Sequence, residues 1–270
     1  MTEEQLRKRH EENLQRLKGF RLMDDDFMTV CLDGQPECVE LILQIIMGKP
    51  DLKVVDLKVQ YFAKNLLKRS VQLDVFATDS KGKKYNIEIQ RTDKGAGAKR
   101  ARYNSSMIDA KVVETRTKFE DLPETYVIFI TENDVLGKGR PLYHIERYIV
   151  EENEEFGDEA HIIYVNGAYR GDDLLGHLMA DFHCTEPSKM YYNKLRNRVA
   201  YFKETKEGVA IMCRAMEEMV EKERAEAKIE GKLEERIQIF AKMRNNGLPI
   251  EQIAELVGIP EEEIRELLNE

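Results

Sequence analysis

A continuous apolar run, Thr-Tyr-Val-Ile-Phe-Ile-Thr at 125–131, constrains the fold of this chain more than any other feature. Because no polar residue alternates along it, the run is typical of a central strand that is covered on both faces. Such a strand needs neighbouring strands on either side and helices above and below. The sequence therefore predicts an α/β domain around a small mixed sheet.

Several other segments supply the expected neighbours of this strand. Residues 70–78 and 84–90 have strand character and are joined by the turn 79–82, which predicts an antiparallel hairpin. A further short strand is expected at 161–166. In residues 54–61, the alternation predicts a strand with one apolar face, formed by Val55, Leu57, Val59 and Tyr61.

Two helices are expected beside these strands, one of them near 99–114. The other runs from Pro36 to Met47, because proline favours the first turn and Gly48 favours a left-handed end. The residues expected on its buried side are Cys38, Leu41, Ile42, Ile45 and Ile46.

The pattern divides the chain into a charged lead helix (1–22), a core domain (23–206) and an all-helical C-terminal arm (207–270). The arm ends in a segment, 248–268, with the spacing of a helix-turn-helix. Its second helix carries only Arg265 against four acidic residues, Glu261, Glu262, Glu263 and Glu266. Such a helix would be repelled from a DNA groove, so we expect it to serve self-association or partner docking, with DNA reading as the alternative.

Composition excludes several classes of protein. The 270 residues are 42% apolar, which suffices for one well-buried core, yet no apolar run is long enough to span a bilayer. The first residues are charged and predict no secretory signal. Four cysteines without a CxxC pair are typical of reduced thiols, and the five histidines do not cluster as zinc ligands would. We therefore expect a cytoplasmic protein with no membrane partner.

Charge is unevenly distributed along the chain. The net charge is -9, but residues 49–118 hold 17 basic and 8 acidic groups, whereas residues 119–160 hold 3 basic and 12 acidic groups. A basic segment of this kind is a candidate surface for nucleic-acid phosphates, although its acidic flanks would repel a polyanion.

The expected hairpin brings three polar side chains to one face of the sheet. Asp74 lies on its first strand, and Glu88 and Gln90 lie two residues apart on its second. Two converging carboxylates favour a hard dication, for which Mg²⁺ is the usual choice beside phosphates and Mn²⁺ a substitute. Gln90 could position a water or a phosphate oxygen. The alternative is that these are polar residues on a solvent-facing sheet.

Several stretches, taken together, carry a resemblance to a known family. The segment from Leu22 to about Asp181 resembles the PD-(D/E)XK nuclease family transposases, also called the recombination-promoting nuclease/putative transposase family. The matching stretches are Met23-Asp-Asp-Asp-Phe-Met28, Val71-Gln-Leu-Asp74, Tyr85-Asn-Ile-Glu-Ile-Gln90, Lys99-Arg-Ala-Arg-Tyr103, Ser106-Met-Ile-Asp109, Tyr126-Val-Ile-Phe-Ile130, Asp134-Val-Leu-Gly137 and Pro141-Leu-Tyr143.

The resemblance implies a restriction-endonuclease-like core, a small mixed sheet flanked by helices, with a Mg²⁺-dependent DNA endonuclease site linked to transposition or recombination. In that site Asp74 and Glu88 would hold the metal and DNA would be the substrate. Gln90 stands where many members of the wider superfamily carry lysine, so another residue must supply the positive charge. The candidates for that charge are Lys83, Lys84, Arg91 and Arg100, and those for a further upstream acid are Asp26 and Glu40.

Residues at the start of the helix near 99–114 are further candidates for DNA contact. Arg100, Arg102 and Tyr103 could bind a phosphate or stack at the site, as the resemblance favours for Arg100. Alternatively, Arg102 pairs with Asp109 and Tyr103 packs in the core.

Two rival functions remain open from the sequence. The chain could be a catalytically inactive nuclease fold that binds DNA or a protein partner. It could also be a scaffold that forms homo-oligomers through the C-terminal arm.

Overall fold

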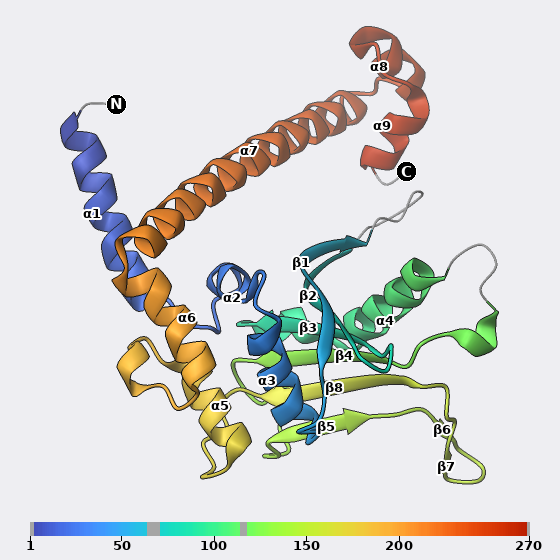
Figure 1. Ribbon diagram of the computed structural model, residues 1–270. Coiled ribbons are helices and arrows are strands. Elements are labelled where there is room, and N and C mark those ends of the chain that lie inside the picture. The colour runs from blue at the N-terminus through green and yellow to red at the C-terminus, as the bar shows by residue number, and fades with distance from the viewer. Residues whose placement is uncertain (1–2, 64–70, 114–117, 269–270) are drawn as a thin grey trace. The chain divides into compact units, whose positions relative to one another are not determined.

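The computed structural model describes residues 3–63, 71–113 and 118–268 (Figure 1). Its contacts divide the chain into two units, Met1–Ala210 and Ile211–Glu270. The first unit contains the sheet and the helices around it, and the second is entirely helical. Each unit is described by itself.

A six-stranded mixed sheet forms the centre of the first unit. Its order is β1-β2-β3-β4-β8-β5; the first three strands are antiparallel, β3, β4 and β8 are parallel, and β5 is antiparallel to β8. The bounds are β1 Val54–Ala63, β2 Val71–Asp79, β3 Lys84–Gln90, β4 Thr125–Thr131, β5 Leu142–Ile145 and β8 Ala160–Asn166, with a separate pair β6 Tyr148–Ile149 and β7 Glu154–Glu155. The predicted mixed sheet and hairpin are confirmed.

The predicted apolar face of β1 is wrong at one end. The register with β2 shifts between Val54 and Asp56, and this irregularity leaves Val55 65% exposed. From Leu57 onward the strand pairs with β2 in one register, and Leu57, Val59 and Tyr61 are half-buried. A β-bulge turns a side chain away from the face that simple alternation assigns to it.

Both faces of the central strand β4 are covered, as the apolar run predicts; all seven of its residues are buried. The helix α4, Ala98–Val112, covers one face. There Ala101 and Ile108 pack on a cluster from three strands, β2, β4 and β8, whose buried members are Leu73, Phe76, Val127, Phe129 and Tyr164. This is also the face of Glu88, because Glu88 pairs with Phe129 across the β3–β4 ladder.

Other helices of the first unit pack among themselves and against the edge strand β1. Contacts join α3 to β1, α5 and α6, and join α2 to α3 and α6. Their bounds are α1 Glu3–Gly19, α2 Asp25–Leu32, α3 Pro36–Met47, α5 Leu174–His183 and α6 Asn193–Glu204, with 3-10 turns η1 Asp93–Ala96, η2 Phe119–Asp121 and η3 Pro187–Lys189.

The helix α3 begins and ends where the sequence predicts, and Gly48 closes it with a φ of 61°. The predicted buried side is shifted, however. Val39 and Leu43 are fully buried, while Leu41 and Ile45 are half-buried. This helix contacts β1 on one side and other helices on another, so its buried surface is wider than a single stripe.

The second unit contains most of α7, Lys206–Asn245, followed by α8, Ile250–Val257, and α9, Glu261–Leu268. Phe240 of α7 packs on Ile250, Ile253 and Ile264 in a small core. Gly258, with a φ of 68°, ends α8, so the two short helices predicted within 248–268 are present. Within the described part of the chain, no helix is both long and apolar enough to cross a membrane.

Candidate active site

Two carboxylates meet where the ladder between β2 and β3 stops. The strands pair regularly as far as Val75 and Ile87. Beyond that point each carboxylate accepts a backbone hydrogen bond from the other strand: the amide of Ile89 donates to Asp74 Oδ2 at 2.9 Å, and the amide of Asp74 donates to Glu88. The strands thus open around this pair, and the two side chains take the place of the missing ladder bonds.

Burial makes this pair of carboxylates electrostatically unfavourable when both are ionised. Desolvation and the charge of Glu88 raise the pKa of Asp74 to about 8, although the amide of Ile89 and Arg100 act against the shift. Desolvation also raises the pKa of Glu88, which is fully buried, against the opposing effects of Asn86 and Arg100. Such paired, raised carboxyl pKa values are typical of functional sites that take up a cation.

A third acid, Asp25 at the start of α2, belongs to this group. Its charge raises the pKa of both Asp74 and Glu88, and its own pKa is raised by desolvation and by neighbouring Asp26. Asp25 is not among the site residues that the sequence predicts. The run Asp24-Asp-Asp26 was the available signal, but which of its members approaches the hairpin depends on how α2 packs.

The two upstream acids proposed from the sequence lie differently. Asp26 is exposed beside Asp25, and its role as a metal ligand stays a prediction. Glu40 on α3 binds Lys53 Nζ at 2.9 Å and the amide of Val54 at 3.2 Å. Glu40 therefore anchors α3 to the start of β1.

Arg100, at the start of α4, is the cation that reaches the acids. Its NH2 group donates to Glu88 Oε2 at 2.9 Å. Its NH1 group donates to Gln90 Oε1 at 3.3 Å and to the carbonyl oxygen of Gly95 at 3.1 Å. A Cβ atom on Gly95 would lie 1.8 Å from Gln90 Oε1, so the absence of a side chain there permits this position of the glutamine.

Other basic candidates are engaged elsewhere. Lys83 forms an ion pair with Glu124, and Lys84 donates to Thr78 Oγ1 at 3.1 Å. Both lie at the end of β3 opposite to Gln90. Arg102 is exposed on α4. Burial raises the pKa of Asp109, and the charge that acts against this shift is that of Arg147.

Tyr103, the remaining candidate on α4, is half-buried. A core residue would be buried and a residue freely accessible to DNA would be exposed, so the exposure of Tyr103 lies between the two alternatives. Its proposed contact with DNA stays a prediction.

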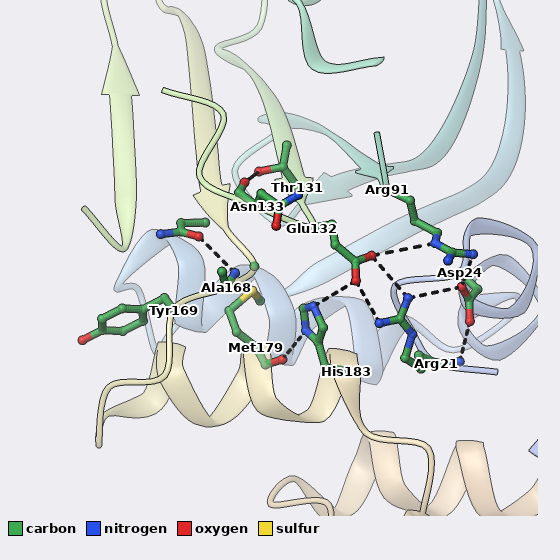
Figure 2. Close-up of polar contacts among 12 residues, drawn as sticks. Arg21, Asp24, Arg91, Thr131, Glu132, Asn133, Ala168, Tyr169, Met179 and His183 are labelled. Carbon is green, nitrogen blue, oxygen red and sulfur yellow. Dashed lines mark hydrogen bonds and ion pairs between the residues drawn. The ribbon is translucent and has the colours of Figure 1, made fainter. Parts of the chain in front are cut away.

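Arg91 belongs to an ion-pair network at the carboxyl ends of β3 and β4 (Figure 2). Its NH1 lies 2.9 Å from Asp24 Oδ1, and its Nε lies 3.8 Å from Glu132 Oε2. Arg21 donates to both oxygens of Glu132, at 2.8 and 3.3 Å, and His183 Nε2 lies 3.6 Å from Oε1. The network ties the residue before Asp25 to the residue after Gln90, and so fixes α2 beside the acids.

The acids fit a hard dication that keeps water in its coordination shell. Within residues 3–63, 71–113 and 118–268, no three acidic, histidine or cysteine side chains gather closely enough to hold a metal by themselves. Mg²⁺, however, is usually bound by one or two carboxylates, with waters and substrate phosphates as its other ligands. Asp74 and Glu88 supply oxygen donors of that kind, with Asp25 adding negative charge.

The mixed sheet with flanking helices, together with an acid-bearing hairpin at its centre, defines an α/β domain of the PD-(D/E)XK nuclease class. Comparison with family profiles gives the same result. The profile described as PD-(D/E)XK nuclease family transposase matches residues 38–168, which include all six strands of the sheet and α4. Residues 38–168 therefore match this family, and the resemblance inferred from the sequence is confirmed over that range. No curated protein and no solved structure matches the chain significantly.

Proposed function

We propose that this protein is a metal-dependent DNA endonuclease that acts in transposition or recombination. The family match supports a nuclease-like domain related to transposition. The observation that carries the finer proposal is the pair Asp74 and Glu88, which are held by each other's strand and have raised pKa values. Paired carboxylates kept at that cost, with Glu88 fully buried and Asp74 half-buried, are typical of a cation site.

In this proposal Mg²⁺, or Mn²⁺ in its place, would be held by Asp74 and Glu88. When bound, the dication would supply Lewis acidity, lower the pKa of an attacking water and neutralise charge on a phosphodiester. Asp25 would stabilise the cation from the start of α2. The ion therefore supplies the charge that makes the three acids compatible with one another.

Two further side chains would act on the substrate. Gln90 has its Oε1 bound by Arg100, so its Nε2 donor is oriented away from that bond and could hold a water or a phosphate oxygen. Arg100 would bind a non-bridging phosphate oxygen, and so supply the positive charge that lysine supplies in many relatives. Glutamine cannot accept a proton as a base, so its role is orientation alone.

A catalytically inactive, DNA- or protein-binding role is the alternative. The ion pair between Arg100 and Glu88 favours it, because this pair already neutralises one of the acids without a metal. Activity separates the two functions.

The test is nicking of a supercoiled plasmid in Mg²⁺ by the wild type and Asp74→Ala. We expect the variant to lose activity by about 100-fold or more, because one of the two carboxylates that hold the ion is gone. Asp56→Ala removes an exposed carboxylate from β1 and is the matched control. Equal cleavage by the wild type and Asp74→Ala would exclude the proposed site.

A further inference from the structure

Arg100 occupies the position of a cation at Glu88. The Arg100 side chain is 42% exposed, whereas Glu88 is fully buried, and their N–O distance is 2.9 Å. The guanidinium thus reaches the buried carboxylate from the accessible side of the site. A dication bound to Glu88 would need an oxygen that is accessible from the same side.

The other hydrogen-bond donors to Glu88 cannot move away from it as easily as Arg100 can. Asn86, which is fully buried in β3, donates its Nδ2 to Glu88 Oε1 at 3.0 Å. The remaining donor is the backbone amide of Asp74 in β2. Both are fixed by the sheet, whereas Arg100 is attached by a long, partly exposed side chain. Arg100 is therefore the partner of Glu88 that can leave.

We infer that Arg100 and the catalytic dication compete for Glu88 Oε2, so that binding of the ion releases the guanidinium toward the DNA phosphate. This inference rests on the proposed function. It adds that binding of the metal and binding of the DNA phosphate by Arg100 are coupled. A guanidinium and a dication that share one carboxylate repel each other, and only one of them can use the same lone pairs. The site would then present its arginine to substrate only after it has bound the metal.

The remaining contacts of Arg100 determine where the released group goes. Its bonds to Gln90 Oε1 and to the carbonyl oxygen of Gly95 both lie at the end of β3, beside the acids. These acceptors are neutral, so they hold the guanidinium less strongly than a phosphate would. Arg100 would therefore remain at the edge of the site with donors free for a bidentate phosphate contact.

The two possible roles of Arg100, competition with the metal and support of the site, predict opposite changes in metal affinity when Arg100 is removed. If Arg100 competes, its removal strengthens metal binding; if Arg100 only organises the site, its removal weakens it. The measurement is calorimetric titration of Mn²⁺ into the full chain without DNA. The variants are Arg100→Gln, which removes the charge, and Arg100→Lys, which keeps the charge but loses the planar fork.

We expect Arg100→Gln to bind Mn²⁺ about tenfold more tightly than the wild type, and Arg100→Lys to lie between them. Lys99→Ala removes an exposed charge from the neighbouring position of α4 and is the matched control; its affinity should equal that of the wild type. Unchanged or weaker binding by Arg100→Gln would overturn the competition.

The same titration separates this inference from the proposed function. If Asp74→Ala and Glu88→Gln bind Mn²⁺ as the wild type does, the metal site itself is wrong, and the competition with it. If both variants lose binding and Arg100→Gln gains none, only the competition is wrong.

A second experiment tests the release of Arg100 without any metal. Glu88→Gln removes the charge that retains the guanidinium, so in EDTA this variant should bind a DNA duplex more tightly than the wild type. The gain should be several-fold smaller when Arg100→Gln is also present, because a double-mutant cycle isolates the coupling of the two side chains. An equal gain in both backgrounds would show that Arg100 is not the released group.

Discussion

Asp74 is the residue at which the chemistry of the proposed site and the stability of the fold conflict. Its ordinary pKa is near 3.8, and burial with Glu88 raises it to about 8. At a pH between these two pKa values, Asp74 keeps its proton in the folded protein but has lost it in the unfolded chain. Stability therefore falls as the pH rises through this window, the opposite of the behaviour of a carboxylate in a salt bridge.

We expect Asp74→Asn to remove this penalty in protein free of divalent ions. The gain in the free energy of unfolding should be larger at pH 8.5 than at pH 5 by about 1–2 kcal/mol, after allowance for partial solvation. Urea denaturation in EDTA at the two pH values measures it, with Asp56→Asn, an exposed carboxylate, as the control. A gain that is equal at both pH values, or larger at pH 5, would contradict the raised pKa.

Part of the site follows from sequence at the level of single residues. The period of two along a strand brings Glu88 and Gln90 to one face, and the hairpin adds Asp74. The contribution of Asp25 does not follow, because it depends on where the eight-residue helix α2 packs. The engagement of Arg91 with Asp24 was missed for the same reason: the partners are far apart in sequence and are brought together by tertiary structure.

At the scale of elements, the strands with a clear pattern and the helix α3 were predictable, but α2, α5 and α6 were not. These helices have 8, 10 and 12 residues, and they lack the proline start and glycine end that mark the equally short α3. The irregularity in β1 was equally hidden. One register shift between Val54 and Asp56 exposes Val55, and the local sequence pattern does not predict this shift.

The helical arm is the element whose role is least connected to the proposed site. Its small core around Phe240 is made within the second unit, and Leu233, Ile239 and Leu256 remain exposed. Self-association through this arm, which the sequence predicts, would cover such side chains if they form one contiguous patch. The homo-oligomer stays a prediction.

We expect a chain truncated after residue 206 to be monomeric and to retain cleavage, because the acids and Arg100 all lie in the first unit. Light scattering of the full chain and the truncated chain measures the oligomeric state, and plasmid nicking measures the activity. A full chain that is itself monomeric, or a truncated chain that keeps the full oligomer, would exclude an oligomer formed through the arm. Loss of cleavage with the fold intact would show that the arm contributes to the site.

At the scale of the whole molecule, local charge matters more than the net charge of -9. The basic segment 49–118 includes β1, β2, β3 and α4, so its excess of lysine and arginine belongs to the same part of the chain as Asp74 and Glu88. A polyanion would be attracted by these basic groups, whereas the ionised acids would repel a phosphate. In the proposed function a bound dication would remove that repulsion, so the proposal depends on the metal.

The most direct measurement is a crystal structure of the full chain soaked in Mn²⁺, with the ion located by its anomalous scattering. We expect an anomalous peak within coordination distance, about 2.0–2.3 Å, of oxygens of both Asp74 and Glu88, with Arg100 displaced from Glu88. Crystals that show no ion between the two carboxylates, while Arg100 stays on Glu88 at saturating Mn²⁺, would contradict it.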